Sequence, residues 1–391
     1  MLTKIAISRV IALLVLLLIS PSLISGQAVL EDIKEEMVLL EDNEIARLDK
    51  ARYIISGLQQ SLDEVENWAD NFLNLDSEQL DCNRLGSTLW KWAKRQASHD
   101  DRRLYWTRLA AFQSLAQSFP RSRISPFTLR SCLDEFDASS RGRSDLSWKQ
   151  DHFRVLVSGF DPFLLDQNIE QSNPSGLAAL ALDNQVLKAI NGDLIHVRAV
   201  IFPVRFQDFD NGVVEAMLLP LLEDKAIDAY ISISMGRESF DLERFPGRRR
   251  SASALDNANR KSGGSEDSPK VPRQGKEALF GPEFLEFNLP ADRMALAPGR
   301  WAIRDNRTVT TLERGTFSAN KLEELANQTA VRGSGGGYLS NEIAYRALNT
   351  MSKSNVQISM GHIHTPRMQN YDRDVLEETV DQIKGMLARL P

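Results

Sequence analysis

A serine directly behind a glycine-rich turn is the first candidate for chemistry, in the sequence GSGGGYLSN at residues 333–341. Glycines allow tight turns and let a backbone approach a ligand closely. The residues that follow have helical spacing, so Ser340 is expected where a loop becomes a helix. Free backbone N–H groups at a helix start favour a developing negative charge, which suits a nucleophile. A serine in this place is also a common helix cap, so this stretch alone leaves both interpretations open.

Two histidines form the second candidate, in the sequence GHIHTP at residues 361–366, directly after a predicted strand. Histidine exchanges protons near neutral pH, so His364 could serve as a general base beside the serine. A His-x-His pair, here His362 and His364, is also common among metal ligands. The sequence offers no third ligand at matching spacing, so we expect neither a metal nor another cofactor. A purely structural role is the alternative for each histidine.

Alternating strands and helices must position these residues. Strand patterns occupy residues 153–158, 194–202, 227–234 and 356–359, and helical patterns occupy 209–223, 318–328, 341–350 and 375–390, with a further helix from Pro174. This alternation predicts an α/β fold, a mostly parallel sheet with helices on both faces. Sites in such sheets lie at the carboxyl ends of strands. We therefore expect residues 160–162, residues 236–237, the glycine turn and residues 361–364 to share one edge.

The chain before this sheet has a different pattern. Apolar residues in the region 28–140 recur at three- and four-residue steps between charged ones, which predicts a separate helical N-terminal domain. A polar run at 139–145 marks the boundary, so the α/β domain is expected over residues 151–391. Within it, the polar residues 247–276 predict a flexible insertion, with the three arginines at 248–250 solvated. The helical domain could dock a partner protein, or the chain could form a homo-oligomer.

The first 27 residues have the pattern of an export signal. Lys4 and Arg9 precede a short apolar run, which is followed by Pro21 and small residues. These features match the charged region, apolar region and cleavage site of a signal peptide over residues 1–27. The run is shorter than the roughly 20 residues that span a bilayer, so we expect no stable membrane insertion after cleavage. An uncleaved anchor is the alternative, and the prediction is a secreted or periplasmic protein.

The composition of the 391 residues limits the class of protein. With 42% hydrophobic and 26% charged residues, the chain is typical of a globular protein with room for two domains. The net charge of −6 argues against nucleic-acid binding, which needs clustered Lys and Arg. Cys82 and Cys132 suggest one disulfide in an exported chain, with two buried thiols as the alternative. Two Asn-x-Thr patterns, at 306–308 and 327–329, fit the glycosylation sequon, which also occurs by chance.

Six motifs in collinear order resemble those of the pyroglutamyl peptidase I family (pyrrolidone-carboxylate peptidases), a family of cysteine peptidases. They are GFDPF at 159–163 with NPS at 173–175, GR at 236–237 with ER at 243–244, DN at 256–257, GP at 281–282 with LP at 289–290, GGYLSN at 336–341, and GHIHTP at 361–366. The resemblance covers the chain from about residue 155 and excludes the N-terminal helices. It implies hydrolysis of the amide after an N-terminal pyroglutamate through an acyl-enzyme.

Carried over position by position, the resemblance also implies site residues. Ser340 would occupy the nucleophile position, His364 would be the general base, and Glu243 would orient the imidazole. The positions that the resemblance assigns to the substrate pocket are Phe160, Phe163, Ile233 and Tyr338.

Three positions depart from the family pattern. Ser340 stands where the family has cysteine, Ile233 stands where it has the glutamine that helps bind the lactam, and Ser253 stands where it has an arginine near the oxyanion. The arginines at 248–250 are candidates to replace that last group. Serine needs a base that removes its proton during attack, and strong oxyanion donors. The sequence thus predicts an exported hydrolase that cleaves a pyroglutamyl or related amide bond of a peptide or small amide with a Ser-His-Glu arrangement. The alternative is a catalytically inactive relative that serves as a binding module.

Overall fold

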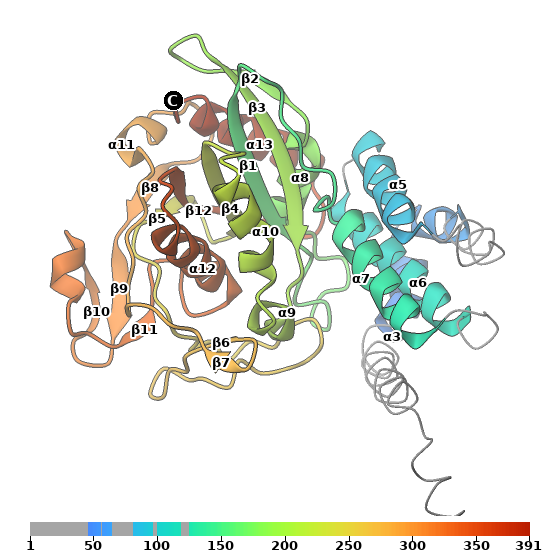
Figure 1. Cartoon of the computed structure of the whole chain (residues 1–391), viewed down its shortest axis with the longest axis horizontal. Helices are drawn as coiled ribbons and strands as arrows, with labels where there is room; N and C mark the ends of the chain where they lie inside the picture. The colour runs from blue at the N-terminus through green and yellow to red at the C-terminus, as the bar shows by residue number, and fades with distance from the viewer. Residues whose placement is uncertain (1–45, 56, 65–80, 97–99, 119–124) are drawn as a thin grey trace, which may run out of the picture.

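The computed structural model describes residues 46–55, 57–64, 81–96, 100–118 and 125–391. The predicted signal peptide, and the helical patterns before residue 46 and at 67–75, lie outside these residues. An α/β body with a group of helices packed against one side makes up the described chain (Figure 1). None of the helices in these ranges combines the length and the apolar character needed to cross a membrane.

A seven-stranded sheet forms the centre of the body, in the order β2-β3-β1-β4-β12-β5-β8. Its strands are β1 Phe153–Phe160, β2 Val186–Lys188, β3 Leu194–Phe202, β4 Ala229–Met235, β5 Phe240–Glu243, β8 Ile303–Asn306 and β12 Ser359–Thr365. The four central strands, β3, β1, β4 and β12, are parallel. Strands β2 and β5 run antiparallel to β3 and β12. The predicted mostly parallel sheet is confirmed.

Helices cover both faces of this sheet (Figure 1). In one pair, a helix packs on β1, β3 and β4 and the second helix packs on the first; in the other pair, a helix packs on β4 and β12 and its partner packs on that helix. The first pair is α8 Pro174–Leu182 with α13 Arg373–Leu387, and the second is α10 Val213–Glu223 with α12 Leu339–Lys353. Strand residues such as Val157, Ile195 and Ile231 are fully buried between the layers, as expected for parallel strands covered on both sides.

The N-terminal helices pack together and against the sheet. They are α3 Ala46–Ile54, α5 Cys82–Arg95, α6 Asp101–Ser118 and α7 Pro126–Ser140. A disulfide between Cys82 and Cys132 joins α5 to α7, which confirms the predicted pair. Buried residues of α5 and α7, among them Trp90 and Phe136, belong to the same hydrophobic core as those of β1, β3 and α8. Helices α5 and α7 therefore share one core with the sheet, whereas buried residues of α3 and several of α6 form a second cluster.

Buried acids join the helical region to the sheet. Asp183, at the end of α8, lies 2.5 Å from Lys94 Nζ and 2.9 Å from Arg198 Nε. Asp161, directly after β1, accepts hydrogen bonds of 2.7 Å from both Arg108 and Arg141. These carboxylates are almost fully buried, and a buried charge is tolerated in a protein when it is paired and hydrogen-bonded.

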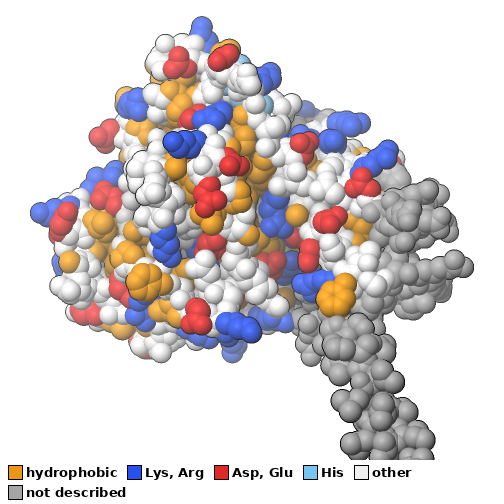
Figure 2. Space-filling model, viewed as in Figure 1, with side chains coloured by type: hydrophobic (Ala, Val, Ile, Leu, Met, Phe, Trp, Pro, Cys, Tyr) orange, Lys and Arg blue, Asp and Glu red, His pale blue; other side chains and the backbone are white. Residues whose placement is uncertain are grey.

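The remaining elements are short. They are α9 Phe206–Asp210, β6 Arg273–Gln274, β7 Glu277–Ala278, α11 Ala291–Met294, β9 Thr308–Thr311, β10 Gly315–Ser318, η4 Leu322–Leu325 and β11 Ala330–Arg332. Strands β10, β9 and β11 form a small antiparallel sheet beside the main one. On the face shown in Figure 2, acidic and basic side chains are interspersed over the surface.

Three predicted elements differ from the structure. The helix predicted at 209–223 is broken into α9 and α10, because Gly212 has a φ of 82°, which an α-helix cannot continue. The helix predicted at 318–328 is wrong: Ser318 pairs with Thr308 in β10, and only the single turn η4 forms before Asn327, whose φ is 61°. The strand predicted at 356–359 lies later, at β12, so both histidines are within the strand.

Candidate active site

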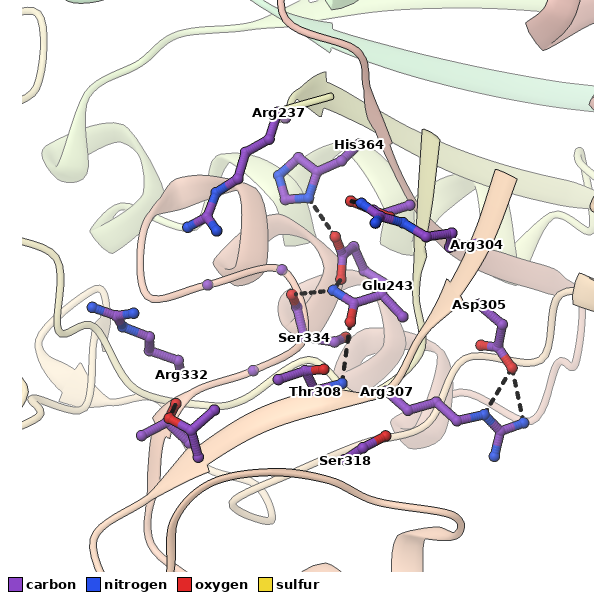
Figure 3. A pocket seen from close by; sticks show the side chains of 18 of the residues that line it. Arg237, Glu243, Arg304, Asp305, Arg307, Thr308, Ser318, Arg332, Ser334 and His364 are labelled. Atoms are coloured by element: carbon purple, nitrogen blue, oxygen red, sulfur yellow. Dashed lines mark hydrogen bonds and ion pairs between the residues drawn. The ribbon is translucent and has the colours of Figure 1, made fainter. Parts of the chain in front are cut away.

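A polar cavity of 670 Å³ opens where β4 and β12 end (Figure 3). Its walls come from the end of β4, from β5, β8 and β12 of the main sheet, from β9 and β10 of the small sheet, and from the glycine turn before α12. Side chains of Glu243, Arg304, Ser334 and His364 surround it (Figure 3). Two separate sheets and one turn therefore contribute to a single site.

Strand register brings Glu243 and His364 into contact. His364 lies opposite Asp241 in the antiparallel pair of β12 and β5, so Glu243 is its diagonal neighbour on the same face of the sheet. His364 Nδ1 is 2.6 Å from Glu243 Oε1. On the other side, Asn306 of β8 lies opposite Glu243 and donates from Nδ2 to Oε2 at 2.8 Å. Two of the residues assigned to catalysis from the sequence are thus hydrogen-bonded to each other.

The contact with Glu243 fixes which ring nitrogen of His364 faces the carboxyl. Glu243 is 2% exposed, and this burial raises the pKa of its carboxyl, while the contacts with His364 and Asn306 oppose the rise. An ionised carboxylate can only accept hydrogen bonds, so Nδ1 of His364 carries the proton and donates to it. The other ring nitrogen, Nε2, then keeps a free lone pair. A histidine in this state can act as a general base.

His362 has a different environment from His364. Its ring is fully buried and lies between the hydroxyl groups of Ser232 and Ser234, each 2.8 Å from one ring nitrogen. Burial, together with the neighbouring His364, lowers the pKa of His362 well below its ordinary value. His362 is therefore a neutral structural residue of the core. No group of three or more His, Cys, Asp or Glu side chains suited to a metal ion occurs in the described part of the chain.

Ser340 lies in the first turn of α12, next to the cavity wall. The helix starts at Leu339 with Tyr338 as its N-cap, so Ser340 is not the capping residue. The Ser340 hydroxyl donates to the carbonyl oxygen of Gly335 at 3.1 Å. Because Gly335 and His364 both line the cavity, this hydroxyl is bonded to a residue of the cavity wall. Within the described residues, Ser340 makes no hydrogen bond with His364.

The residues assigned to a substrate pocket from the sequence do not line this cavity. Phe160 is buried and stacks on Phe209, with ring centroids 6.2 Å apart. Ile233 is fully buried in β4, and Phe163 is half-buried against the hydrophobic core. Tyr338 donates its hydroxyl to the carbonyl of Leu255 at 2.9 Å. These four residues are held mainly by packing.

Three of the four segments predicted to share one edge of the sheet line the same cavity, and the fourth lines another. Gly236, the glycine turn and His364 line the cavity described above, as expected from the sequence. Asp161 instead lines a separate cavity of 430 Å³ between α6, α7, α9 and residues 256–260. Strand β1 runs parallel to β4, and β4 to β12, so residues 160–162 do lie at the predicted edge of the sheet. Arg108 and Arg141 bind the Asp161 carboxylate there, outside the cavity around His364.

The three consecutive arginines do not reach the cavity. Arg248 and Arg249 both pair with Glu283. Arg250 is 4% exposed and pairs with Glu342 of α12, with its Nε 2.5 Å from the carboxylate. The prediction of a solvated Arg250 is therefore wrong. The buried ion pair ties the segment 247–276 to the helix that carries Ser340.

Two residues of the site had no functional signal in the sequence. Asn306 supports Glu243, yet its only sequence pattern is a glycosylation sequon. Arg304 lies opposite Asp241 in the β5–β8 register and pairs with it at 2.8 Å. Both side chains come from β8, a four-residue polar strand at the sheet edge. A strand without apolar residues at alternate positions gives no period to detect.

Comparison with known proteins identifies the family of the sheet region. Residues 154–320 and 303–369 match the family described as "PA0049, C-terminal domain". The matched region covers more than half of the 391 residues. The chain belongs to the PA0049 C-terminal domain family. A relative in Pseudomonas aeruginosa, the uncharacterized protein PA0049, is 27% identical over 381 residues, covering 73% of this chain and 69% of the relative.

Solved structures of pyroglutamyl peptidases are also similar to this member of the PA0049 C-terminal domain family. A mutant pyrrolidone carboxyl peptidase from Pyrococcus furiosus is 21% identical with a TM-score of 0.39, covering 61% of this chain and 97% of that chain. Pyroglutamyl peptidase I from Bacillus amyloliquefaciens is 19% identical with a TM-score of 0.39, covering 61% of this chain and 93% of that chain. Because both TM-scores are low, an inference about function must come from the site residues themselves.

Proposed function

We propose that this chain is an exported amide hydrolase in which Ser340 is the nucleophile, His364 is the general base and Glu243 orients the imidazole. The observation that carries the proposal is the 2.6 Å hydrogen bond between His364 Nδ1 and Glu243 Oε1 on the wall of an open polar cavity. The motifs shared with pyroglutamyl peptidases suggest the bond to be cleaved. It is the amide after an N-terminal pyroglutamate or a similar blocked residue.

The first half of the reaction forms an acyl-serine. The Ser340 side chain leaves the Gly335 carbonyl by rotating about χ1 to another staggered position. His364 Nε2 takes the hydroxyl proton as Ser340 Oγ attacks the amide carbon, and Glu243 stabilises the imidazolium that forms. Backbone N–H groups in the first turn of α12 have no partner within the helix, so they can donate to the oxyanion. The C–N bond then breaks, and the imidazolium gives its proton to the leaving amine.

The second half of the reaction restores the enzyme. Water enters the space left by the amine, and His364 Nε2 removes a proton from it as its oxygen attacks the acyl carbon. The ester bond to Ser340 breaks, and the serine oxygen takes the proton back from the imidazolium. Asn306 donates to Glu243 Oε2, so the carboxylate stays aimed at the imidazole in both halves. All protons move between atoms of His364, Ser340, water and substrate.

Export is part of the proposal. The signal-like residues 1–27 suggest it, and the Cys82–Cys132 disulfide is consistent with an oxidising compartment. A serine nucleophile is compatible with such a compartment, since it lacks the oxidisable thiol of a cysteine. The test is fractionation of the source cells with mass spectrometry of the N-terminus. An intact N-terminus on a cytoplasmic protein would contradict export.

The hydrolase proposal is tested with a fluorogenic pyroglutamyl arylamide. We expect the purified chain to release the amine, and Ser340→Ala to reduce the rate by roughly 10³-fold or more. Ser352→Ala is the matched control, because this exposed serine lies at the far end of the same helix. Activity that survives Ser340→Ala would exclude Ser340 as the nucleophile. Absence of activity in the wild-type chain with all blocked amides tested would remove the proposal.

Replacement of the nucleophile gives a second test. Neither cysteine is a free thiol, so Ser340→Cys introduces a single reactive position. We expect this variant to hydrolyse the arylamide and to lose activity with an alkylating reagent, because a thiol is the more acidic nucleophile. An intact but inert Ser340→Cys variant would favour the second candidate function, an inactive binding module. The observation that favours the inactive binding module is that the Ser340 hydroxyl donates to Gly335 and not to His364.

A further inference from the structure

One arginine in the cavity lacks a charged partner. The arginines that line the cavity are Arg237, Arg304, Arg307 and Arg332. Three of them form ion pairs, namely Arg304 with Asp241, Arg307 with Asp305 and Arg332 with Glu266. Over the described residues, the guanidinium of Arg237 has neither a carboxylate nor a hydrogen-bond acceptor within contact, and its side chain is exposed. It is an unpaired positive charge available to a ligand.

The backbone holds Arg237 beside the catalytic histidine. Gly236 N donates to Thr365 O at 2.9 Å, and Arg367 N donates to Arg237 O at 2.7 Å, so the turn after β4 is fixed to the end of β12. A side chain at Gly236 would come within 2.7 Å of His364 Cβ, which explains the glycine. Figure 3 shows the Arg237 guanidinium reaching into the cavity next to the His364 ring.

The cavity is the part of the site left for the leaving group. The residues assigned to the acyl side, such as Phe160 and Tyr338, lie outside it. Ser340 is bonded to a glycine of its wall, and His364 faces into it. A substrate with its amide carbon at Ser340 and its acyl group outside the cavity would extend its leaving amine into the cavity, toward Arg237. An anionic group on the amine side would meet an unpaired arginine.

We propose that Arg237 binds a carboxylate on the leaving group, so that the preferred substrates are N-blocked peptides with a negative charge after the scissile amide. This inference rests on the proposed function. A guanidinium can hold a carboxylate by two parallel hydrogen bonds, which a neutral leaving group cannot form. Because the arginine is exposed, we expect a preference of about tenfold in affinity rather than a larger one. The carboxylate is either the C-terminus of a dipeptide or an acidic side chain.

The test is calorimetric binding to the full chain carrying Ser340→Ala, which prevents turnover. The probes are pyroglutamyl-alanine, its neutral C-terminal amide, and pyroglutamyl-glutamic acid with only its α-carboxyl amidated. Each is measured with Arg237 intact, with Arg237→Gln and with Arg237→Lys. Arg300→Gln is the matched control, because Arg300 is exposed, pairs with Glu378 and does not line the cavity.

We expect an anionic probe to bind about tenfold more tightly than the neutral amide. Arg237→Gln should abolish that difference, Arg237→Lys should keep part of it, and Arg300→Gln should leave it unchanged. Whichever anionic probe shows the preference identifies the source of the carboxylate. Equal binding of all three probes, no binding of any, or a preference that persists in Arg237→Gln would overturn the inference.

Hydrolysis rates of the same peptides, measured with Ser340 present, separate the two proposals. Hydrolysis with no preference for a carboxylate would support the hydrolase proposal and contradict the proposed role of Arg237. If the probes bind with a carboxylate preference that depends on Arg237 but none is hydrolysed, the anion site is supported and the hydrolase proposal is contradicted.

Discussion

Asp101, in the first turn of α6, lies 2.5 Å from the Ser172 hydroxyl and accepts a 2.8 Å hydrogen bond from the backbone N–H of Asn173, the residue that caps α8. This acid is 2% exposed. Burial, together with the neighbouring Asp100, raises its pKa from an ordinary 3.8 to about 8. A single protonated carboxyl therefore connects the helical region to the start of a sheet-covering helix.

The first prediction is that the contribution of Asp101 to the free energy of unfolding falls with rising pH. The folded chain keeps the Asp101 proton up to about pH 8, whereas the unfolded chain releases it near pH 3.8. The contribution of this group is therefore fully present below pH 3.8 and is lost as pH rises to about 8. Asp101→Asn mimics the protonated acid, so it should be more stable than wild type at pH 8 and less sensitive to pH between 4 and 8. Urea unfolding at several pH values measures this.

Asp381→Asn is the control for that prediction, because Asp381 pairs with Lys384 on the surface. It should change the free energy of unfolding by less than about 0.5 kcal/mol at each pH. A loss of stability in Asp101→Asn that is greatest at pH 8 would show that Asp101 is ionised in the folded chain.

The second prediction concerns the acid behind the histidine. Glu243 accepts hydrogen bonds at both oxygens, from His364 and from Asn306. Glu243→Gln has only one accepting oxygen, so its amide nitrogen must face one of these two donors. Facing His364, it would favour the tautomer with the proton on Nε2, which cannot act as a base. We expect kcat to fall by roughly 10²- to 10⁴-fold. Nitrogen NMR of the His364 ring would report the tautomer without an activity assay.

Glu286→Gln serves as the comparison for that variant, since Glu286 pairs with Arg244 and does not line the cavity. Its activity and its His364 spectrum should match the wild type. A Glu243→Gln variant that keeps full activity would rule out a role for this acid in catalysis.

The third prediction concerns the disulfide. Cys82 and Cys132 are 50 positions apart, and in the chain-entropy description a loop of that size stabilises the folded state by about 4 kcal/mol. The double variant Cys82→Ser with Cys132→Ser should therefore unfold at a clearly lower denaturant concentration. A reducing agent should lower the stability of the wild type to a similar value and should not affect the double variant. Equal stability of the two proteins under oxidising conditions would contradict this prediction.

The fourth prediction concerns the charges around Asp161. This buried carboxylate compensates both Arg108 and Arg141, and burial with the nearby Arg141 lowers the pKa of Arg108. Asp161→Asn would leave two buried cations with less compensation, at a cost of about 3–5 kcal/mol. Arg108→Met should cost less, because it removes a charge and an unsatisfied buried nitrogen together. Combining the two substitutions should recover part of the loss from Asp161→Asn, as measured in a double-mutant cycle.

The explanation would be contradicted if the combined variant lost more stability than the two single variants lose together. Arg130→Met, on the exposed Arg130–Asp134 pair of α7, provides the surface control. We expect it to change stability by no more than about 1 kcal/mol.

The sequence predicts the core of the sheet well because its strands are continuous apolar runs. Strand β3 begins and ends at the predicted residues 194 and 202, since nearly every side chain in it is buried. Strand β12 is harder to locate, because Gly361 and the two histidines interrupt its apolar pattern. Its pairing with β4 and β5 stabilises it despite that composition. Burial on both faces is visible in a sequence, whereas pairing with a distant strand is not.

For the candidate site, too, the sequence indicates the residue types but not which strands pair. Short motifs point to Glu243 and His364, but only the antiparallel placement of β5 beside β12 makes them neighbours. Arg237 belongs to the Gly-Arg motif, but the motif assigns it no role, and Asn306 belongs to no motif of the site. Their positions depend on the turn after β4 and on the edge strand β8. The position of the Ser340 hydroxyl depends on a side-chain rotation. Residue types can be carried over from a motif, whereas distances require the register of the whole sheet.

The shared core beneath α5 and α7 means that the limits of sequence similarity are not the limits of a foldable fragment. The family match begins at residue 154, yet a fragment cut there would leave Asp161 and Asp183 without their partners from the helices. It would also expose to water the apolar surface that Trp90 and Phe136 normally cover. Expression of the isolated sheet region should therefore yield aggregated material, and studies of this family should keep the preceding helices attached.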